Sequence, residues 1–114
     1  MKICVICPVR NGVPGAVVEY VAQQEKLGHI VHFPPRDNPQ DDPIGNIICQ
    51  TMVDAISNAD TVALYYDPTS QGVHFDLGIA FVFRRPIMLL NPNEELRKSG
   101  KSYLNVAAWL SFQK

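Results

Sequence analysis

The fold is most constrained by residues 61–91, which read TVALYYDPTSQGVHFDLGIAFVFRRPIMLLN. Two apolar runs, Thr61–Tyr66 and Pro86–Leu90, have the length and composition of buried strands. Between them a polar loop, Asp67–Gly72, leads into a segment of helical length, Val73–Phe83. Parallel strands need such a crossover helix, so this stretch predicts a β-α-β unit of a parallel sheet.

The same alternation of strand and helix fills the chain before residue 61. Lys2–Cys7 is a continuous apolar run, typical of a central parallel strand that is covered on both faces. A helix is expected from Pro14 to Leu27, where Gly28 ends it as a left-handed cap. The second strand is expected at His29–Phe33.

A further amphipathic helix is expected after a polar loop at Arg36–Asp42, which is long enough to reach over a site. Asp42 is the expected N-cap, and Pro43 falls in the first turn. The apolar residues follow three-and-four spacing and predict one buried face, formed by Ile44, Ile47, Ile48, Met52, Ala55, Ile56 and Ala59.

The C-terminal part is less regular. Residues 91–100 read as a polar loop, with a short helical turn expected at Glu94–Lys98. Tyr103–Phe112 is compatible with a helix, and its last part, Ala108–Phe112, is also compatible with a short edge strand.

These elements predict a single domain over residues 1–114. Right-handed crossovers give the strand order 2-1-3-4, with a fifth strand if the C-terminal segment pairs. The expected fold is α/β and flavodoxin-like (Rossmann-like), a doubly wound parallel sheet of four to five strands.

Composition narrows the classes of partner. The formal net charge is -1, so nothing favours nucleic acid or a membrane surface. No apolar run reaches the length of a membrane span and the N-terminus lacks a signal-peptide pattern, so we expect a cytoplasmic protein. Cys4 and Cys7 should point to opposite faces of their strand, which argues against a redox or zinc pair. We expect no metal and no cofactor.

Polar side chains capable of chemistry gather after the third strand. Ligands of open α/β sheets bind at the carboxyl ends of strands, where Asp67, Ser70 and Gly72 lie. Asp76 is expected in the first turn of the next helix, where the helix dipole keeps a carboxylate ionised. Such a carboxylate can attack an oxocarbenium-like carbon, and Asp67 can donate a proton or orient the ligand. Ser70 can donate to a hydroxyl or phosphate, and Gly72 lets backbone amides approach a ligand.

These residues also have purely structural interpretations. Asp67 suits an ordinary turn in which its carboxylate bonds the backbone two residues on. Asp76 can be a charge at a helix start, and His74 an exposed helix residue. With His29 and His32 on another strand, the histidines show no metal-ligand spacing.

Residues 67–80 read DPTSQGVHFDLGIA and are followed by Arg85, Pro86 and Ile87. This string resembles the core motif of the nucleoside 2-deoxyribosyltransferase superfamily: an aspartate-bearing loop, Ser or Asp, Gly, then Glu-x-Gly-x-Ala and a Lys-Pro-hydrophobic strand. Residues 59–63 (ADTVA) match the family's usual approach to the preceding strand, and residues 105–109 (NVAAW) are similar to its Asn-Leu-Met-x-Trp segment.

The resemblance implies a reaction on a nucleoside or nucleotide. Asp76 stands at the family's nucleophilic glutamate and would attack C1′, release the base and form a glycosyl-enzyme. A second base or water would then complete the reaction with net retention, and Asp67 would lie near the departing base. Ser70 stands where transferases acting on free nucleosides have Asp and where relatives hydrolysing 5′-monophosphates have Ser, which favours a nucleotide.

Three further residues complete the implied site. Arg10, in the loop after the first strand, is a candidate partner for the phosphate. Tyr66 (or Tyr65) can replace the aromatic residue that many family members place in that loop. Asn105 would contact the sugar's 5′ end across the interface of a homodimer or higher homo-oligomer. In one departure from the family, Asp76 is one methylene shorter than glutamate, which withdraws the carboxylate by ~1.5 Å.

Other functions fit parts of the sequence. A catalytically silent nucleotide-binding module on the same fold is the main alternative, and a structural partner protein without a ligand is another. A response-regulator receiver would explain Asp67, but Cys7 and Pro8 stand where it needs an acidic pair. A low-molecular-weight phosphatase would use the spacing of Cys4 and Arg10, but Cys4 lies inside a strand.

Overall fold

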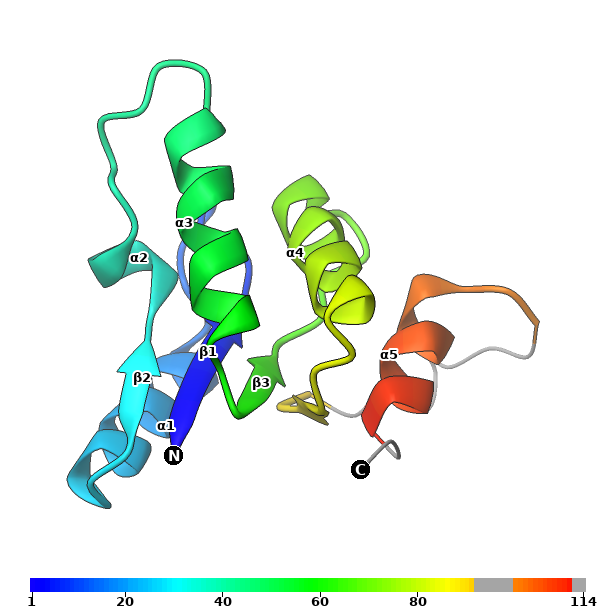
Figure 1. The fold of residues 1–114 in the computed structure, drawn as a ribbon, viewed down its shortest axis with the longest axis horizontal. Coiled ribbons are helices and arrows are strands. Elements are labelled where there is room, and N and C mark those ends of the chain that lie inside the picture. The colour runs from blue at the N-terminus through cyan, green and yellow to red at the C-terminus, as the bar shows by residue number, and fades with distance from the viewer. Residues whose placement is uncertain (92–99, 112–114) are drawn as a thin grey trace.

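The computed structural model describes residues 1–91 and 100–111. Its strands form one parallel sheet in the order β2-β1-β3-β4 (Figure 1), which confirms the predicted flavodoxin-like fold. No fifth strand is found within these residues. The strands are β1 (Lys2–Ile6), β2 (Ile30–His32), β3 (Thr61–Leu64) and β4 (Ile87–Leu89).

The helices cover the two faces of this sheet unequally. α1 (Gly15–Lys26) packs on one face, while α3 (Asn46–Ser57), α4 (Gln71–Val82) and α5 (Tyr103–Ser111) pack on the other (Figure 1). Cys4 and Cys7 lie in different cores, as the alternation along a strand predicts. The three-helix core includes Ile6, Leu64, Met52, Ile56, Val73, Leu77, Leu104 and Leu110, and the core under α1 includes Ile3, Val5, Val17, Val21 and Val31.

The carboxyl ends of all strands lie at one edge, because every pair is parallel. β1 and β3 are direct neighbours, with Ile3 opposite Thr61 and Ile6 opposite Leu64. The helices that follow them, α1 and α4, leave to opposite faces. The edge therefore has its topological switch point between β1 and β3, where ligands of open α/β sheets bind.

One predicted loop contains an additional helix. α2 (Pro34–Asp37) occupies the start of the region expected to be irregular. The two prolines that end β2 also suit the first turn of a helix, because their φ is fixed and no amide is needed there. The carboxylate of Asp37 accepts a hydrogen bond from the amide of Phe33 at 2.8 Å, which closes this turn.

The predicted start of α3 is wrong. The helix begins at Asn46, because Gly45 adopts a left-handed conformation (φ 85°) that ends the preceding loop. Asp42 is not the N-cap, but its Oδ2 accepts from the amide of Ile48 at 2.8 Å and so still serves this helix end. Ile44 and Ile47, predicted to be buried, are exposed.

The ambiguous C-terminal element is a helix, so the edge-strand alternative is wrong for the described residues up to Ser111. Its inner face is formed by Leu104, Ala107 and Leu110. The helical turn expected at Glu94–Lys98 and the last predicted residue, Phe112, lie outside the described residues. Within residues 1–91 and 100–111, no helix is long and apolar enough to cross a membrane.

α1 offers a matched test of this packing, because Val17 is fully buried and its neighbour Val18 is 49% exposed. We expect Val17→Ala to lower the free energy of unfolding by ~1–3 kcal/mol through lost burial and a cavity. Val18→Ala should change it by less than ~0.5 kcal/mol. Urea unfolding followed by circular dichroism measures both, and equal effects would contradict the assignment of the inner face of α1.

Candidate functional site

The loop between β3 and α4 is held by its own side chains. Asp67 Oδ1 accepts from the amide of Thr69 at 2.9 Å and from its hydroxyl at 2.7 Å, the arrangement expected of an ordinary turn. These two hydrogen bonds lower the pKa of Asp67 below its ordinary value, and the bond from the Thr69 hydroxyl has the larger effect. A carboxyl group that stays ionised can orient a ligand but is a poor proton donor at neutral pH.

Ser70 is the N-cap of α4. Its Oγ accepts from the amide of Val73 at 3.2 Å, which satisfies one of the free amides of the first turn. Gly72 lies exposed in that turn, and a Cβ added there would meet nothing closer than Ser70 Oγ at 4.0 Å. The fold therefore does not itself require glycine at this position, and the space above it is open.

Asp76 lies in the second turn of α4, not in the first as predicted, because the helix begins at Gln71. Its side chain is half-buried and forms no hydrogen bond or ion pair within the described part of the chain. Burial raises its pKa from the ordinary 3.8 to about 7. Desolvation, rather than the helix dipole, therefore dominates the charge of this carboxyl group.

The carboxyl group of Asp76 lies close to β1 and to the residue that follows it. Burial raises the pKa of both Cys4 and Cys7 to about 12, and the charge of Asp76 is the next cause for each thiol. Cys7 directly follows the last residue of β1, so Asp76 lies near the switch point between β1 and β3. Both thiols are protonated at neutral pH, which leaves Asp76 as the better nucleophile of this group.

His74, predicted to be an exposed helix residue, is hydrogen-bonded at both ring nitrogens. Nδ1 lies 2.7 Å from the carbonyl oxygen of Ser70, and Nε2 lies 2.7 Å from the hydroxyl of Tyr66. A carbonyl oxygen can only accept, so Nδ1 carries a proton, and in the neutral imidazole Nε2 then accepts from the Tyr66 hydroxyl. The four-residue spacing between Ser70 and His74 was the available signal, since helical residues four apart are neighbours.

Asn91 fixes the backbone of Tyr66. Its Oδ1 accepts from the amide of Tyr66 and its Nδ2 donates to the carbonyl of Tyr66, each at 2.8 Å. The pairing of Leu64 with Leu89 places Asn91 opposite Tyr66 by extension of the strand register. This clamp was missed, although a polar residue directly after a buried strand is a usable signal.

The two flanks of α4 face different surroundings. His74 faces α5, where the ring of Tyr103 lies 5.3 Å from its own between centroids. Residues two apart on a helix point to nearly opposite sides, and Asp76 accordingly lies toward β1. The structure therefore groups Tyr66 with His74, separately from Asp76.

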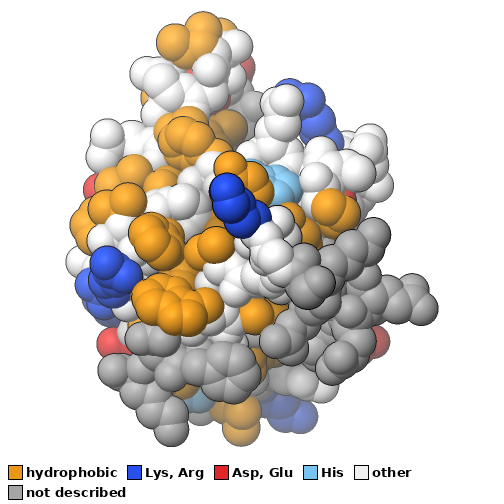
Figure 2. Space-filling view, turned by 90° about the vertical axis from the view of Figure 1, so that its right-hand side faces the viewer, with side chains coloured by type: hydrophobic (Ala, Val, Ile, Leu, Met, Phe, Trp, Pro, Cys, Tyr) orange, Lys and Arg blue, Asp and Glu red, His pale blue; other side chains and the backbone are white. Residues whose placement is uncertain are grey.

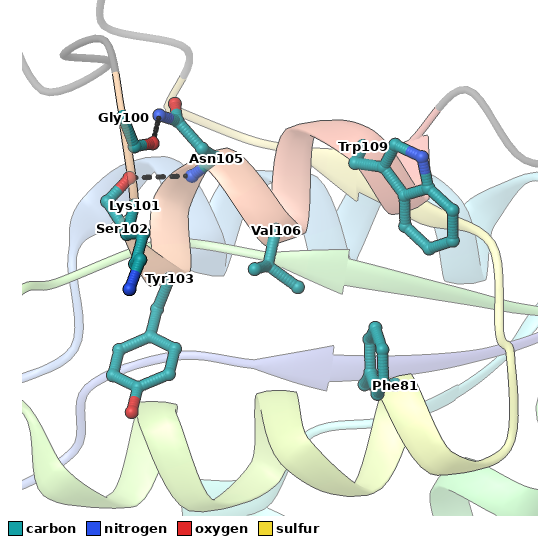
Figure 3. Close-up of a pocket in the computed structure, with 8 residues that line it drawn as sticks. All are labelled: Phe81, Gly100, Lys101, Ser102, Tyr103, Asn105, Val106 and Trp109. Atoms are coloured by element: carbon teal, nitrogen blue, oxygen red, sulfur yellow. Dashed lines mark hydrogen bonds between the residues drawn. The ribbon is translucent and has the colours of Figure 1, made fainter.

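Asn105 lies in a groove of about 790 Å³ between α4 and α5 (Figure 3). Its Nδ2 donates to the carbonyl of Gly100 at 2.8 Å. Figure 3 shows Val106 pointing toward Phe81 of α4, and Figure 2 shows apolar side chains gathered on this side of the molecule. Asp76 does not line this groove, so Asn105 and Asp76 of one chain do not share it.

Arg10 is exposed in the loop after β1 and makes no hydrogen bond or ion pair with other described residues. It projects from the same sheet edge as the β3–α4 loop and remains available to an anion. Over residues 1–91 and 100–111, no group of three or more His, Cys, Asp or Glu side chains could hold a metal ion.

No protein-family model matches the chain, and no curated protein matches it. Comparison with solved structures does find matches. One is a 2-deoxyribosyltransferase from the psychrotolerant bacterium Bacillus psychrosaccharolyticus, with a TM-score of 0.61, 18% sequence identity and an alignment covering 96% of each chain. At this identity the likeness establishes a shared fold over nearly the whole length of both chains.

The two aspartates should have opposite effects on stability. The folded protein retains the Asp76 proton up to about pH 7, whereas the unfolded chain releases it near pH 4, so this contribution to stability is lost as pH rises between these values. We therefore expect Asp76→Asn to match the wild type near pH 4 and to be more stable by ~1–3 kcal/mol at pH 8.

Asp67→Asn is the control for this pH dependence. The lowered pKa of Asp67 stabilises the folded protein above the ordinary pKa of aspartate, and that contribution is lost as pH falls. The substitution should therefore destabilise the protein at pH 8. Urea unfolding at pH 4, 6 and 8 measures both variants. A stability gain from Asp76→Asn that does not grow with pH would contradict the raised pKa of the half-buried Asp76 carboxyl group.

Proposed function

We propose that this chain cleaves or transfers the N-glycosidic bond of (deoxy)nucleosides or their 5′-monophosphates, with Asp76 as the nucleophile. The observation that carries the proposal is the position of Asp76, a half-buried carboxyl group near the carboxyl end of β1 that has no partner among the described residues. Two further observations support it: the motif over residues 67–80 and the fold shared with a 2-deoxyribosyltransferase.

The reaction has two substitutions at C1′ of the sugar. In the first, an oxygen of Asp76 bonds to C1′ while the C1′–N bond breaks, and the base leaves with the electron pair and takes a proton from water. In the second, another base or water attacks C1′ and the carboxylate departs. Two inversions give net retention.

The ionised form of Asp76 performs the first substitution. With a pKa of about 7, roughly half of the molecules carry this form at neutral pH. Positive charge developing on the sugar ring favours the anion further as the reaction proceeds. Asp67 stays ionised and contributes by orienting the base through its second oxygen, since Oδ1 is held by Thr69.

The proposed substrate is a nucleotide rather than a free nucleoside. Ser70 Oγ accepts from the Val73 amide, which leaves its own O–H free to donate to a phosphate oxygen. The positive end of the α4 dipole favours an anion at the same place, and Gly72 leaves room for it. Arg10 adds an exposed cation from the neighbouring loop, without an ion-pair partner in the described part of the chain.

We propose that a second copy of the chain completes the site in a homodimer or higher homo-oligomer. α4 is apolar on its outer side as well, with Phe75 53% exposed and Val82 73% exposed. Asn105 lies in a groove that does not include Asp76 of the same chain. From there it is proposed to reach the sugar bound by a neighbouring subunit.

The second candidate function is a nucleotide-binding module without catalysis. It is favoured by the shorter side chain of Asp76, which withdraws the carboxylate from C1′, and by the raised pKa of this group, which lowers its ionised fraction at neutral pH. Tight nucleotide binding without release of free base would identify this function.

We expect the purified protein to release free base from deoxynucleoside 5′-monophosphates, as measured by liquid chromatography. The rate should rise with pH through about 7, because the anion of Asp76 is the reactive form. Asp76→Ala should lower the rate by at least ~10³-fold. Asp76→Glu is the conservative control and should retain activity; an Asp76→Ala variant as active as the wild type would exclude Asp76 as the nucleophile.

Mixing two inactive variants tests the shared site. Asp76→Ala and Asn105→Ala homo-oligomers should each be inactive, because each site lacks one essential side chain. Hybrids formed from both should regain about a quarter to a half of wild-type activity, since some sites then combine two intact residues. Absence of recovery in subunits shown by mass spectrometry to have exchanged would contradict the contribution of Asn105 across an interface.

A further inference from the structure

We propose that His74 is the positioning residue for the phosphate end of this site, acting through Ser70 and Tyr66. The choice of phosphate as ligand rests on the proposed function. The link itself rests on the two 2.7 Å hydrogen bonds of the imidazole.

The first bond replaces part of the backbone bonding at the start of α4. The amide of His74 lies 3.4 Å from the carbonyl oxygen of Ser70, which is long for a helical hydrogen bond. Nδ1 of the same residue reaches this oxygen at 2.7 Å. The imidazole therefore fixes the orientation of Ser70 more strongly than the helix backbone does.

The second bond ties this helix end to the sheet. Nε2 of His74 holds the hydroxyl of Tyr66, a buried residue whose backbone is clamped on both sides by Asn91. The ring of Tyr103 also packs edge-on against the imidazole. With both nitrogens bonded and two rings against it, His74 has little freedom to rotate, and it couples Ser70 rigidly to the end of β3.

Ser70, which His74 couples to the end of β3, is also the residue proposed to bind phosphate. Ser70 supplies a free O–H, and the first amides of α4 follow it directly. Asp76 is positioned differently, on a helix that is anchored by the buried side chains of Val73, Leu77 and Ala80. Loss of the His74 bonds should therefore weaken binding of the phosphate and leave the chemistry at C1′ nearly unchanged.

Kinetics on two substrates separates positioning from general destabilisation. His74→Phe keeps an aromatic ring in contact with Tyr66 and Tyr103 but removes both hydrogen bonds. We expect it to raise KM for a deoxynucleoside 5′-monophosphate about tenfold, to change kcat by less than about threefold, and to leave KM for the unphosphorylated nucleoside unchanged.

Two matched variants complete the set. His74→Asn can still donate to the carbonyl of Ser70, so its KM for the monophosphate should rise less than that of His74→Phe. Tyr66→Phe removes only the hydrogen bond to Nε2 and should show the remaining part of the rise in KM. An equal loss on both substrates, or His74→Asn no better than His74→Phe, would overturn the inference in favour of a merely structural histidine.

Nitrogen-15 NMR of the His74 ring at pH 8 tests the link without any catalysis. We expect protonated Nδ1 and unprotonated Nε2, with the Nε2 signal shifting in Tyr66→Phe. An Nε2-protonated ring in an enzyme that releases base would overturn this inference alone. If the ring shows the expected tautomer but no base is released, the proposed catalysis is overturned and the role of His74 is tested by calorimetric binding. In that case His74→Phe must bind the monophosphate more weakly than the wild type does and must bind the nucleoside equally well.

Discussion

The proposed chemistry depends on one half-buried carboxyl group, that of Asp76, which has no counter-charge within the described residues. A parallel sheet places the ends of β1 and β3 side by side, and α4 then carries Asp76 close to β1. Within the described residues nothing neutralises this group, so desolvation raises its pKa to about 7. Such a group reduces the stability of the folded state near neutral pH and is typical of a functional site.

Three sides of α4 contact different parts of the molecule. Val73, Leu77 and Ala80 anchor the helix in the core. One flank presents Asp76 toward β1, and the other binds the end of β3 through His74 and Tyr66. Because adjacent turns of one rigid helix carry both groups, the proposed phosphate position and the proposed nucleophile keep a fixed separation.

The strand order could be predicted from the sequence, because apolar runs and crossover helices are local patterns with few compatible topologies. The start of α3 could not be predicted, because the left-handed conformation of Gly45 delays the helix to Asn46. Asp42 lies before the helix and still accepts a hydrogen bond from the amide of Ile48 in its first turn. Asp67 and Ser70 lie in the loop where they were expected, but the turn bonds of Asp67 favour orientation over proton donation.

Other properties arise only when distant segments meet. The pKa of Asp76 depends on its burial in the folded chain, and its charge in turn affects Cys7, almost seventy residues earlier, which helix position alone does not reveal. The tautomer of His74 requires both Tyr66 and Ser70 in place, and the clamp by Asn91 requires the β3–β4 register. A single sequence shows these residues but not their contacts. The separation of Asn105 from Asp76 within one chain is likewise a property of the packing of α5 against α4.

The most direct test of the central claim is mass spectrometry of the protein quenched in acid during incubation with a deoxynucleoside 5′-monophosphate. We expect a glycosyl ester whose added mass is that of the sugar phosphate without the base, assigned by fragmentation to Asp76. Release of base without any adduct, or an adduct on another residue such as Asp67, would contradict it.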